Sequence, residues 1–447
     1  MNAFVRAPAR PHVMSGFADW LIVGLLVLAI GILAVVSAPL LTEYKIHYVS
    51  TGGRFFEKLH PATYAVFLAL GVLLLRNGNP MGEIDRIVTS AKSLLVFLFC
   101  WSLLFVECLV MHRPFTGIID TFLLPVIFSV VVWNLTPADK RPLVWVVHCL
   151  IWFNIAIGYY EHFSAHRLVV LTVGGVPVNG EWRSTAFLAS PLAASSIVGL
   201  YVLALVLRPE LCRPLWLRIP AILLSLGSVA IAFGGRTALM SVLVIIACIV
   251  VLRAFRVAFG QRVALPAVML TICGLFLVSV VILALYEYGA FDKMLMRFSS
   301  DNGSAHARLQ SLRLLALLDW KEFILGTDAI RSSALQSMTG LQYGIEDFWI
   351  ACIVQYGIVS TALITIGMGC FFVELLRRSE SVAGIAVLFI TIDAASSVSF
   401  SSKNTTLTLL VALIVTLFPR RVMRRAVPAG RMQGKPAHLR FSSVAAH

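Results

Sequence analysis

Long apolar blocks recur along the whole sequence and constrain its fold more than any other feature. Each block has roughly the 20-residue length that a helix needs to cross about 30 Å of hydrocarbon. Apolar residues make up 59% of the chain and charged residues 13%, whereas about a quarter are charged in soluble globular proteins. Because backbone groups in lipid must be satisfied internally, long blocks without alternation favour helices over a barrel. The sequence therefore predicts an all-α polytopic membrane protein.

The blocks predict about twelve transmembrane helices. We expect them at about 18–38, 61–75, 91–111, 118–134, 143–160, 184–207, 219–233, 237–252, 263–286, 346–374, 382–398 and 405–418. An even number places both termini on one side of the membrane. The segments on that side carry 22 of the 36 Lys and Arg residues, so the positive-inside rule makes both termini cytoplasmic.

The connection between the ninth and tenth spans is the one long polar interruption. It divides the chain into spans 1–9 (residues 1–286), an outward loop (287–345), spans 10–12 (346–418) and a basic cytoplasmic tail (419–447). Ser304 is a candidate N-cap for an amphipathic helix reaching about Trp320, and Gly326 ends the segment after it. We therefore expect a large, partly helical loop that rests on the bundle as a lid.

The positions of the charged residues and of the cysteines indicate which partners and which covalent links to expect. The net charge of +14 comes from Lys and Arg beside the spans and in the tail, so it indicates a membrane surface and no nucleic acid. Seven of the eight cysteines fall inside apolar runs, and no disulfide framework is visible.

Three arginines in outward segments are candidates for binding an anion. Arg236 follows Gly234 and Gly235 in a tight reversal, Arg308 lies on the loop helix, and Arg183 precedes the sixth span. Each also has a simpler interpretation, as a snorkelling, solvated or interfacial cation. Guanidinium groups that converge suit phosphate, because each bonds two oxygens at once.

Two adjacent acids, Glu346 and Asp347, open the tenth span. They are candidates for a general base, although acids at a helix start are also favoured by the helix dipole. His162 and His166 have the i,i+4 spacing of metal ligands, but no third ligand accompanies them and no metal is expected.

Acids in or near the spans keep a transporter interpretation open. Glu107, Asp120 and Glu374 lie close to predicted span ends, whereas Asp393 lies deeper and is expected to pair with Lys403 or an Arg. Carboxylates inside a membrane are typical of proton and ion paths.

The order of several short motifs resembles the O-antigen ligase and polysaccharide polymerase family of bacterial inner membranes. The matching pieces are Gly235-Arg236-Thr237-Ala238, Ala307-Arg308-Leu309, Lys321–Gly326, and Glu346-Asp347-Phe348 leading to Gln355-Tyr356-Gly357-Ile358. The resemblance covers roughly residues 180–375.

The resemblance implies a helical C-type glycosyltransferase of the inner membrane, with its active site on the periplasmic face. Its donor would be a polyprenyl-diphosphate-linked glycan and its acceptor a lipid-linked glycan, with no metal and no cofactor. Arg236 and Arg308 would bind the diphosphate, with Arg183 as a third cation, and Glu346, beside Asp347, would take the place of the family's catalytic His. Fixed cations would stabilise the charge that grows as the glycosidic bond breaks.

The missing His favours a polymerase of O-antigen or exopolysaccharide repeat units. A ligase that moves finished glycan to lipid A core or to protein is the alternative within the family. A transporter or flippase of lipid-linked sugar is an alternative of another class, and a scaffolding subunit working with other polysaccharide-assembly proteins is a third.

Overall fold

Helices dominate the structure, a computed structural model. It describes residues 16–50, 52–173, 176–178, 182–188, 190–212, 214–260, 304–341, 344–345, 347–395 and 403–420, with a few single residues between 261 and 303. The short strands β1 (Thr172–Val173) and β2 (Val176–Pro177) pair antiparallel in the connection after the fifth expected span.

Among the described residues, seven helical segments are long and apolar enough to cross a membrane. They are α1 (Phe17–Val35), α5 (Ser93–Val110), the run Thr116–Trp133 formed by α6 (Thr116–Ile118), η2 (Ile119–Leu123) and α7 (Leu124–Trp133), α8 (Lys140–Ser164), Trp216–Phe233 in α10 (Leu215–Gly227) and η4 (Ser228–Phe233), α11 (Arg236–Ala258) and α17 (Phe348–Arg378). An eighth results if α3 (Pro61–Leu75) and α4 (Pro80–Ser90), bent by 107°, form one span. The chain is therefore a helical polytopic membrane protein, as expected. The count of twelve stays a prediction, and its ninth span, 263–286, falls largely outside the described residues.

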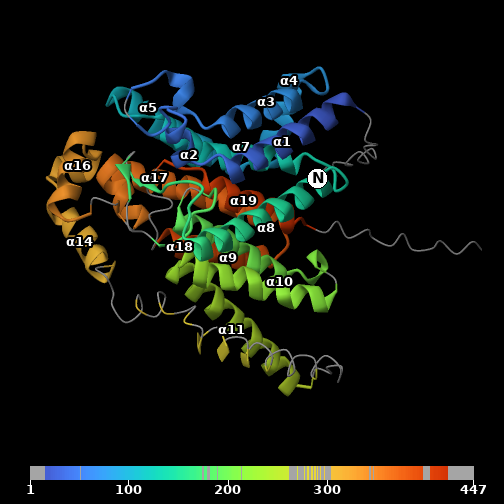
Figure 1. Ribbon diagram of the computed structural model, residues 1–447. Coiled ribbons are helices and arrows are strands. Elements are labelled where there is room, and N and C mark those ends of the chain that lie inside the picture. Colours follow the sequence, from blue (N-terminus) through green and yellow to red (C-terminus); the bar gives the residue numbers. More distant parts are fainter. Residues whose placement is uncertain are drawn as a thin grey trace, which may run out of the picture.

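Three apolar helices in the described part of the chain are shorter: α9 (Pro191–Leu207), α18 (Ala383–Ala394) and α19 (Thr406–Leu417). The 12 residues of α19 rise only about 18 Å, yet every one of them is buried. α19 packs against α1, α7, α8 and α9, at the centre of the bundle (Figure 1). Because protein surrounds it, its ends need no lipid-exposed backbone.

The sixth span begins later than the sequence predicts. We expected it from residue 184, but α9 begins at Pro191. The Ser190 side chain accepts a hydrogen bond from the Ala193 N–H, and proline at the first helical position fits this start. Residues 182–188 form a separate turn, described below as the Arg183 turn.

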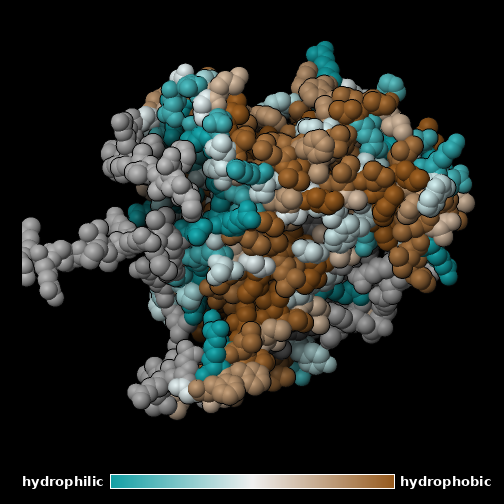
Figure 2. All heavy atoms as spheres, turned by 180° about the vertical axis from the view of Figure 1, so that it is seen from behind, coloured by the Kyte–Doolittle hydropathy of each residue, from teal (hydrophilic) through white to brown (hydrophobic). Residues whose placement is uncertain are grey.

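A broad apolar surface lies between two hydrophilic margins on one face of the molecule. Figure 2 shows this band on one face, with hydrophilic side chains along two opposite borders. Large exposed apolar residues on α5 and α11, such as Phe99, Val106, Val244 and Val250, fit contact with acyl chains. The arrangement is that of a bundle crossing a bilayer.

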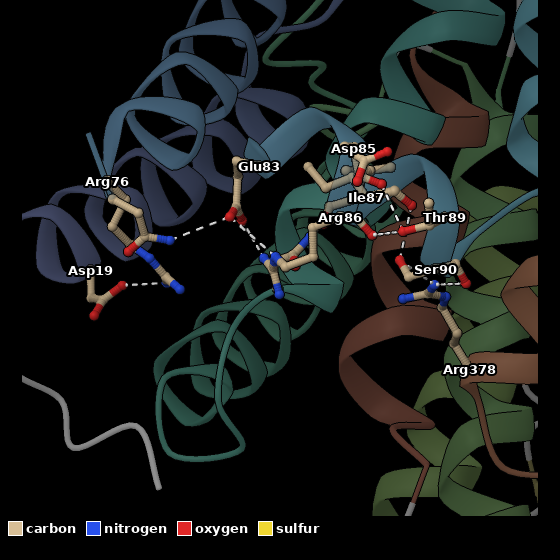
Figure 3. Close-up of polar contacts among 12 residues, drawn as sticks. Asp19, Arg76, Glu83, Asp85, Arg86, Ile87, Thr89, Ser90 and Arg378 are labelled. Carbon is tan, nitrogen blue, oxygen red and sulfur yellow. Dashed lines mark hydrogen bonds and ion pairs between the residues drawn. The ribbon is translucent and has the colours of Figure 1, made fainter. Parts of the chain in front are cut away.

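Cations that the charge rule assigns to the cytoplasm lie together at one end of the bundle (Figure 3). Arg76 pairs with Asp19 at 2.8 Å, and Arg86 pairs with the buried Glu83. Arg378 donates to the Ser90 carbonyl at 2.8 Å, which ties the end of α17 to α4. The opposite end of the bundle is called the outer face below, following the positive-inside rule.

Cysteine labelling tests this orientation. In a variant whose eight native cysteines are removed, Arg54→Cys should react with a membrane-impermeant maleimide on intact spheroplasts. Asp85→Cys, on α4, should react only after the membrane is permeabilised. The reverse pattern would contradict the assigned orientation.

Candidate functional site

A buried carboxylate organises the Arg183 turn. Glu161, in the last turn of α8, is only 3% exposed. Its side chain accepts hydrogen bonds from the backbone N–H groups of Leu168, Thr185 and Ala186, and from the Ser184 hydroxyl. A buried carboxylate with several donors is well satisfied and holds its neighbours in place. The sequence interpretation missed Glu161, although an acid in the last turn of an apolar span was the available signal.

The Arg183 turn lies directly against the reversal that carries Arg236. The Ser184 N–H donates to the Ala232 carbonyl at 2.9 Å. Gly234 has φ 61°, and a Cβ there would lie 3.1 Å from Arg183 Cδ. A Cβ on Gly235 would overlap the Ser195 side chain, so glycine is needed there for space and at 234 for its left-handed φ. The structure thus brings Arg183 together with the segment that positions Arg236 at the start of α11.

The other predicted site residues lie on or beside the loop helices, which are α14 (Ser304–Ala316), α15 (Trp320–Leu325) and α16 (Ala329–Met338). Arg308 is on α14, but its side chain lies outside the described part of the structure, as does all of Glu346. Asp347 is the N-cap of α17, and its Oδ1 accepts from the Ile350 N–H at 2.9 Å. The interpretation of Asp347 as a helix-start acid is therefore confirmed, and a catalytic role stays a prediction.

The loop helices pack on the first half of α17 through their own small core. Leu314, Leu335 and Leu341 are buried against Ile350 and Val354. The expected loop helix is present with Ser304 as its first residue, but it ends at Ala316 instead of reaching about Trp320, because the Asp319 capping box starts a new helix, α15. The expected segment end at Gly326 is confirmed. The loop is thus a folded unit on the bundle.

Two glycines make the closest contact between the loop helices and α17. Gly357 interrupts α17 with φ 81° and ψ 167°, and Gly326 ends α15 with φ 78°. A Cβ on Gly326 would lie 2.7 Å from the Gly357 nitrogen, and a Cβ on Gly357 would collide with the Ile324 carbonyl. Thr327 adds two hydrogen bonds of 2.8 Å to the Val354 carbonyl, from its N–H and its hydroxyl. The motifs Lys321–Gly326 and Gln355–Ile358 therefore meet in space.

A cavity of about 590 Å³ lies at the outer face beside this contact. Basic residues from three connections line it: Lys58, His112, Arg113 and Lys403. Gln355 and Tyr356 of α17 form another part of its wall, and Arg113 donates to the Leu325 carbonyl of α15 at 2.6 Å. We refer to this space as the basic cavity.

Lys403, in the lining of the basic cavity, is surrounded by polar partners that were not predicted from the sequence. Its ammonium donates to the carbonyls of Tyr48 and Lys58 and to the Thr116 hydroxyl, and lies 4.0 Å from Asp120. The pKa of Lys403 is lowered to about 8, mainly by burial; Asp120 raises it in part and Lys58 contributes to the lowering.

Asp393 was expected to pair with Lys403 or a neighbouring Arg, and the Lys403 alternative is wrong. Asp393 on α18 accepts from the Ser196 hydroxyl at 2.5 Å, whereas Lys403 lies with Asp120. Hydropathy marks both acids as unusual but carries no information on which helix faces them.

The two histidines with metal-ligand spacing do not share a helix. α8 ends at Ser164, and Ala165 adopts a left-handed conformation with φ 55°, so His166 lies beyond the helical turn of His162. Among the described residues, no group of three His, Cys, Asp or Glu side chains could hold a metal ion.

Fold and surface together define the class as a helical, polytopic membrane protein with loop helices packed on α17. No protein-family model and no curated protein matches the sequence. The function is therefore argued below from the residues themselves.

The glycine contact gives a stability prediction. Gly357→Ala should destabilise the protein by about 2 kcal/mol or more, because its φ and ψ are nearly restricted to glycine and its Cβ would collide with backbone. Gly369→Ala, later in α17 with nothing within 4 Å of its Cβ, is the matched control. Thermal unfolding in detergent measures both. Equal melting temperatures for the two variants would contradict the contact.

His60 gives a pH prediction. Its Nε2 lies 2.7 Å from the Val36 carbonyl, and its Nδ1 accepts from the Ala62 N–H, which fits a neutral ring. Burial lowers the pKa of His60 from 6.5 to about 4. The unfolded chain therefore takes up a proton first as pH falls, and stability should drop by about 3 kcal/mol between pH 6.5 and 4.

The non-titrating variant His60→Asn retains a side-chain acceptor for the N-cap. It should lose that part of the acid sensitivity in chemical unfolding measured across this pH range. An unchanged slope would refute the assignment to His60.

Proposed function

We propose that the protein transfers a glycan from a polyprenyl diphosphate to a lipid-linked acceptor at the outer face, as a polysaccharide polymerase. One observation carries the proposal: the Glu161-held Arg183 turn lies against the Gly234–Gly235 reversal that begins α11 at Arg236. Arg183 thereby lies against the reversal that directly precedes Arg236. Guanidinium groups suit a diphosphate, which gains charge as it leaves.

The reaction needs a leaving group, a nucleophile and a base. An acceptor hydroxyl oxygen forms the new bond to the anomeric carbon of the donor sugar, while the bond from that carbon to the diphosphate oxygen breaks. The hydroxyl proton passes to a carboxylate, and the polyprenyl diphosphate departs. We assign Glu346 or Asp347 as that base, and Arg236, Arg308 and Arg183 as the cations that stabilise the leaving diphosphate.

The position of Asp347 supports its part in this scheme. It stands at the outer end of α17, where the loop helices pack. Its hydrogen bond to the Ile350 N–H fixes one carboxylate oxygen, and a carboxylate has further acceptor sites for a substrate hydroxyl. The folded loop covers this end of the helix, which favours exclusion of water from a transfer reaction.

Arginine substitutions test the proposal. Arg236→Ala should lower long-chain glycan formation by about 100-fold or more, because a fixed cation at the leaving group is lost. Arg308→Ala should have a similar effect. Arg253→Ala, exposed near the other end of α11, is the matched control and should leave glycan formation unchanged.

The readout is glycan length in cells, with protein level and lipid-linked single units measured alongside. Retained single units with no long chains support transfer. Loss of single units from the outer leaflet would point to a transporter instead, and full activity of both arginine variants would reject the proposal.

A further inference from the structure

The basic cavity is a second cationic location, separate from the arginine pair. Its lining includes Lys58, Arg113 and Lys403 but neither Arg183 nor Arg236. Its described lining residues include no Asp or Glu. A volume of about 590 Å³ is within the usual range for small-molecule sites.

Two of its cations form ion pairs with acids that lie outside the cavity lining. Arg113 pairs with Glu107 at 3.0 Å, and Lys403 lies 4.0 Å from Asp120. Lys58 donates to the neutral Ser50 carbonyl. Three cations against these two acids leave a net positive charge beside the space, which suits an anion.

The mouth of the basic cavity is apolar. Phe55, in η1 (Phe55–Lys58), lines the cavity and is 55% exposed, and its ring packs on Phe115 at 5.8 Å between centroids. The neighbouring Phe56 is equally exposed. Aromatic rings at the level of a membrane interface accompany an apolar chain beside a charged headgroup. The ligand chemistry is thus that of an amphiphile with a phosphate headgroup.

The cavity lies on the same part of α17 as the proposed base Asp347, before the break at Gly357. Gln355, in its wall, lies eight residues after Asp347 on α17, which corresponds to about 12 Å along the helix. The outer end of α17 would therefore lie at a distance from a headgroup in the cavity that one or two sugar units can span.

We propose that the basic cavity binds the diphosphate headgroup of the lipid-linked acceptor, while Arg183 and Arg236 hold the donor. This inference rests on the proposed function, since two lipid-linked substrates are needed only if one glycan is transferred to another. It assigns Lys58 and Arg113 as acceptor-binding residues.

Binding of farnesyl diphosphate to the purified protein in nanodiscs tests the inference by calorimetry. The wild-type protein should bind two equivalents. Lys58→Gln and Arg113→Gln should each weaken one of them about tenfold, through loss of a charged hydrogen-bond donor, whereas Lys58→Arg should retain it. Arg54→Gln, in the same connection but outside the lining, is the matched control and should bind like wild type.

The outcomes separate the two proposals. If Lys58→Gln and Arg113→Gln, with wild-type melting temperatures, bind two equivalents normally while Arg236→Gln loses one, the acceptor site is rejected and the donor site stands. If Lys58→Gln loses one equivalent and Arg236→Gln loses none, the acceptor site stands and the donor placement is rejected. Inorganic pyrophosphate binding as tightly as farnesyl diphosphate would overturn the assignment to a lipid.

Discussion

The geometry of the proposed donor site depends on the hydrogen bonds that the buried Glu161 carboxylate accepts. At the end of α8, it accepts from the N–H groups of Leu168, Thr185 and Ala186. Non-helical backbone near a membrane interface is tolerated only where protein satisfies it. Glu161 does so, and the turn it stabilises places Arg183 against the reversal before Arg236.

The same requirement explains why irregular backbone gathers at the outer face. The Arg183 turn, the broken α17 at Gly357 and the polar group around Lys403 each combine a strained or non-helical segment with donors from another element. At the other end of the bundle, the partly buried ion pair Arg76–Asp19 joins the end of α3 to α1. At the outer face, hydrogen bonds between elements therefore fix the position of irregular segments, which is consistent with a functional site there.

Sequence predicted the elements better than their partners. Apolar blocks marked α1, α5 and α8, and Ser304 and Gly326 marked the ends of loop segments, because length, capping and glycine conformations act locally. Partner choice is not local. Lys403 lies with Asp120 on another helix, and the contact between Gly326 and Gly357 could be seen only as two separate motifs. Hydropathy also cannot distinguish burial in lipid from burial in protein, so the short, fully buried α19 resembled an ordinary span.

The central claim is that the protein itself forms a glycosidic bond between lipid-linked glycans, and reconstitution tests it most directly. Purified protein in liposomes, supplied only with polyprenyl-diphosphate-linked repeat units, should produce longer lipid-linked glycans and release polyprenyl diphosphate in equal amount. Unchanged repeat units alongside their movement between leaflets would contradict the claim and identify a transporter.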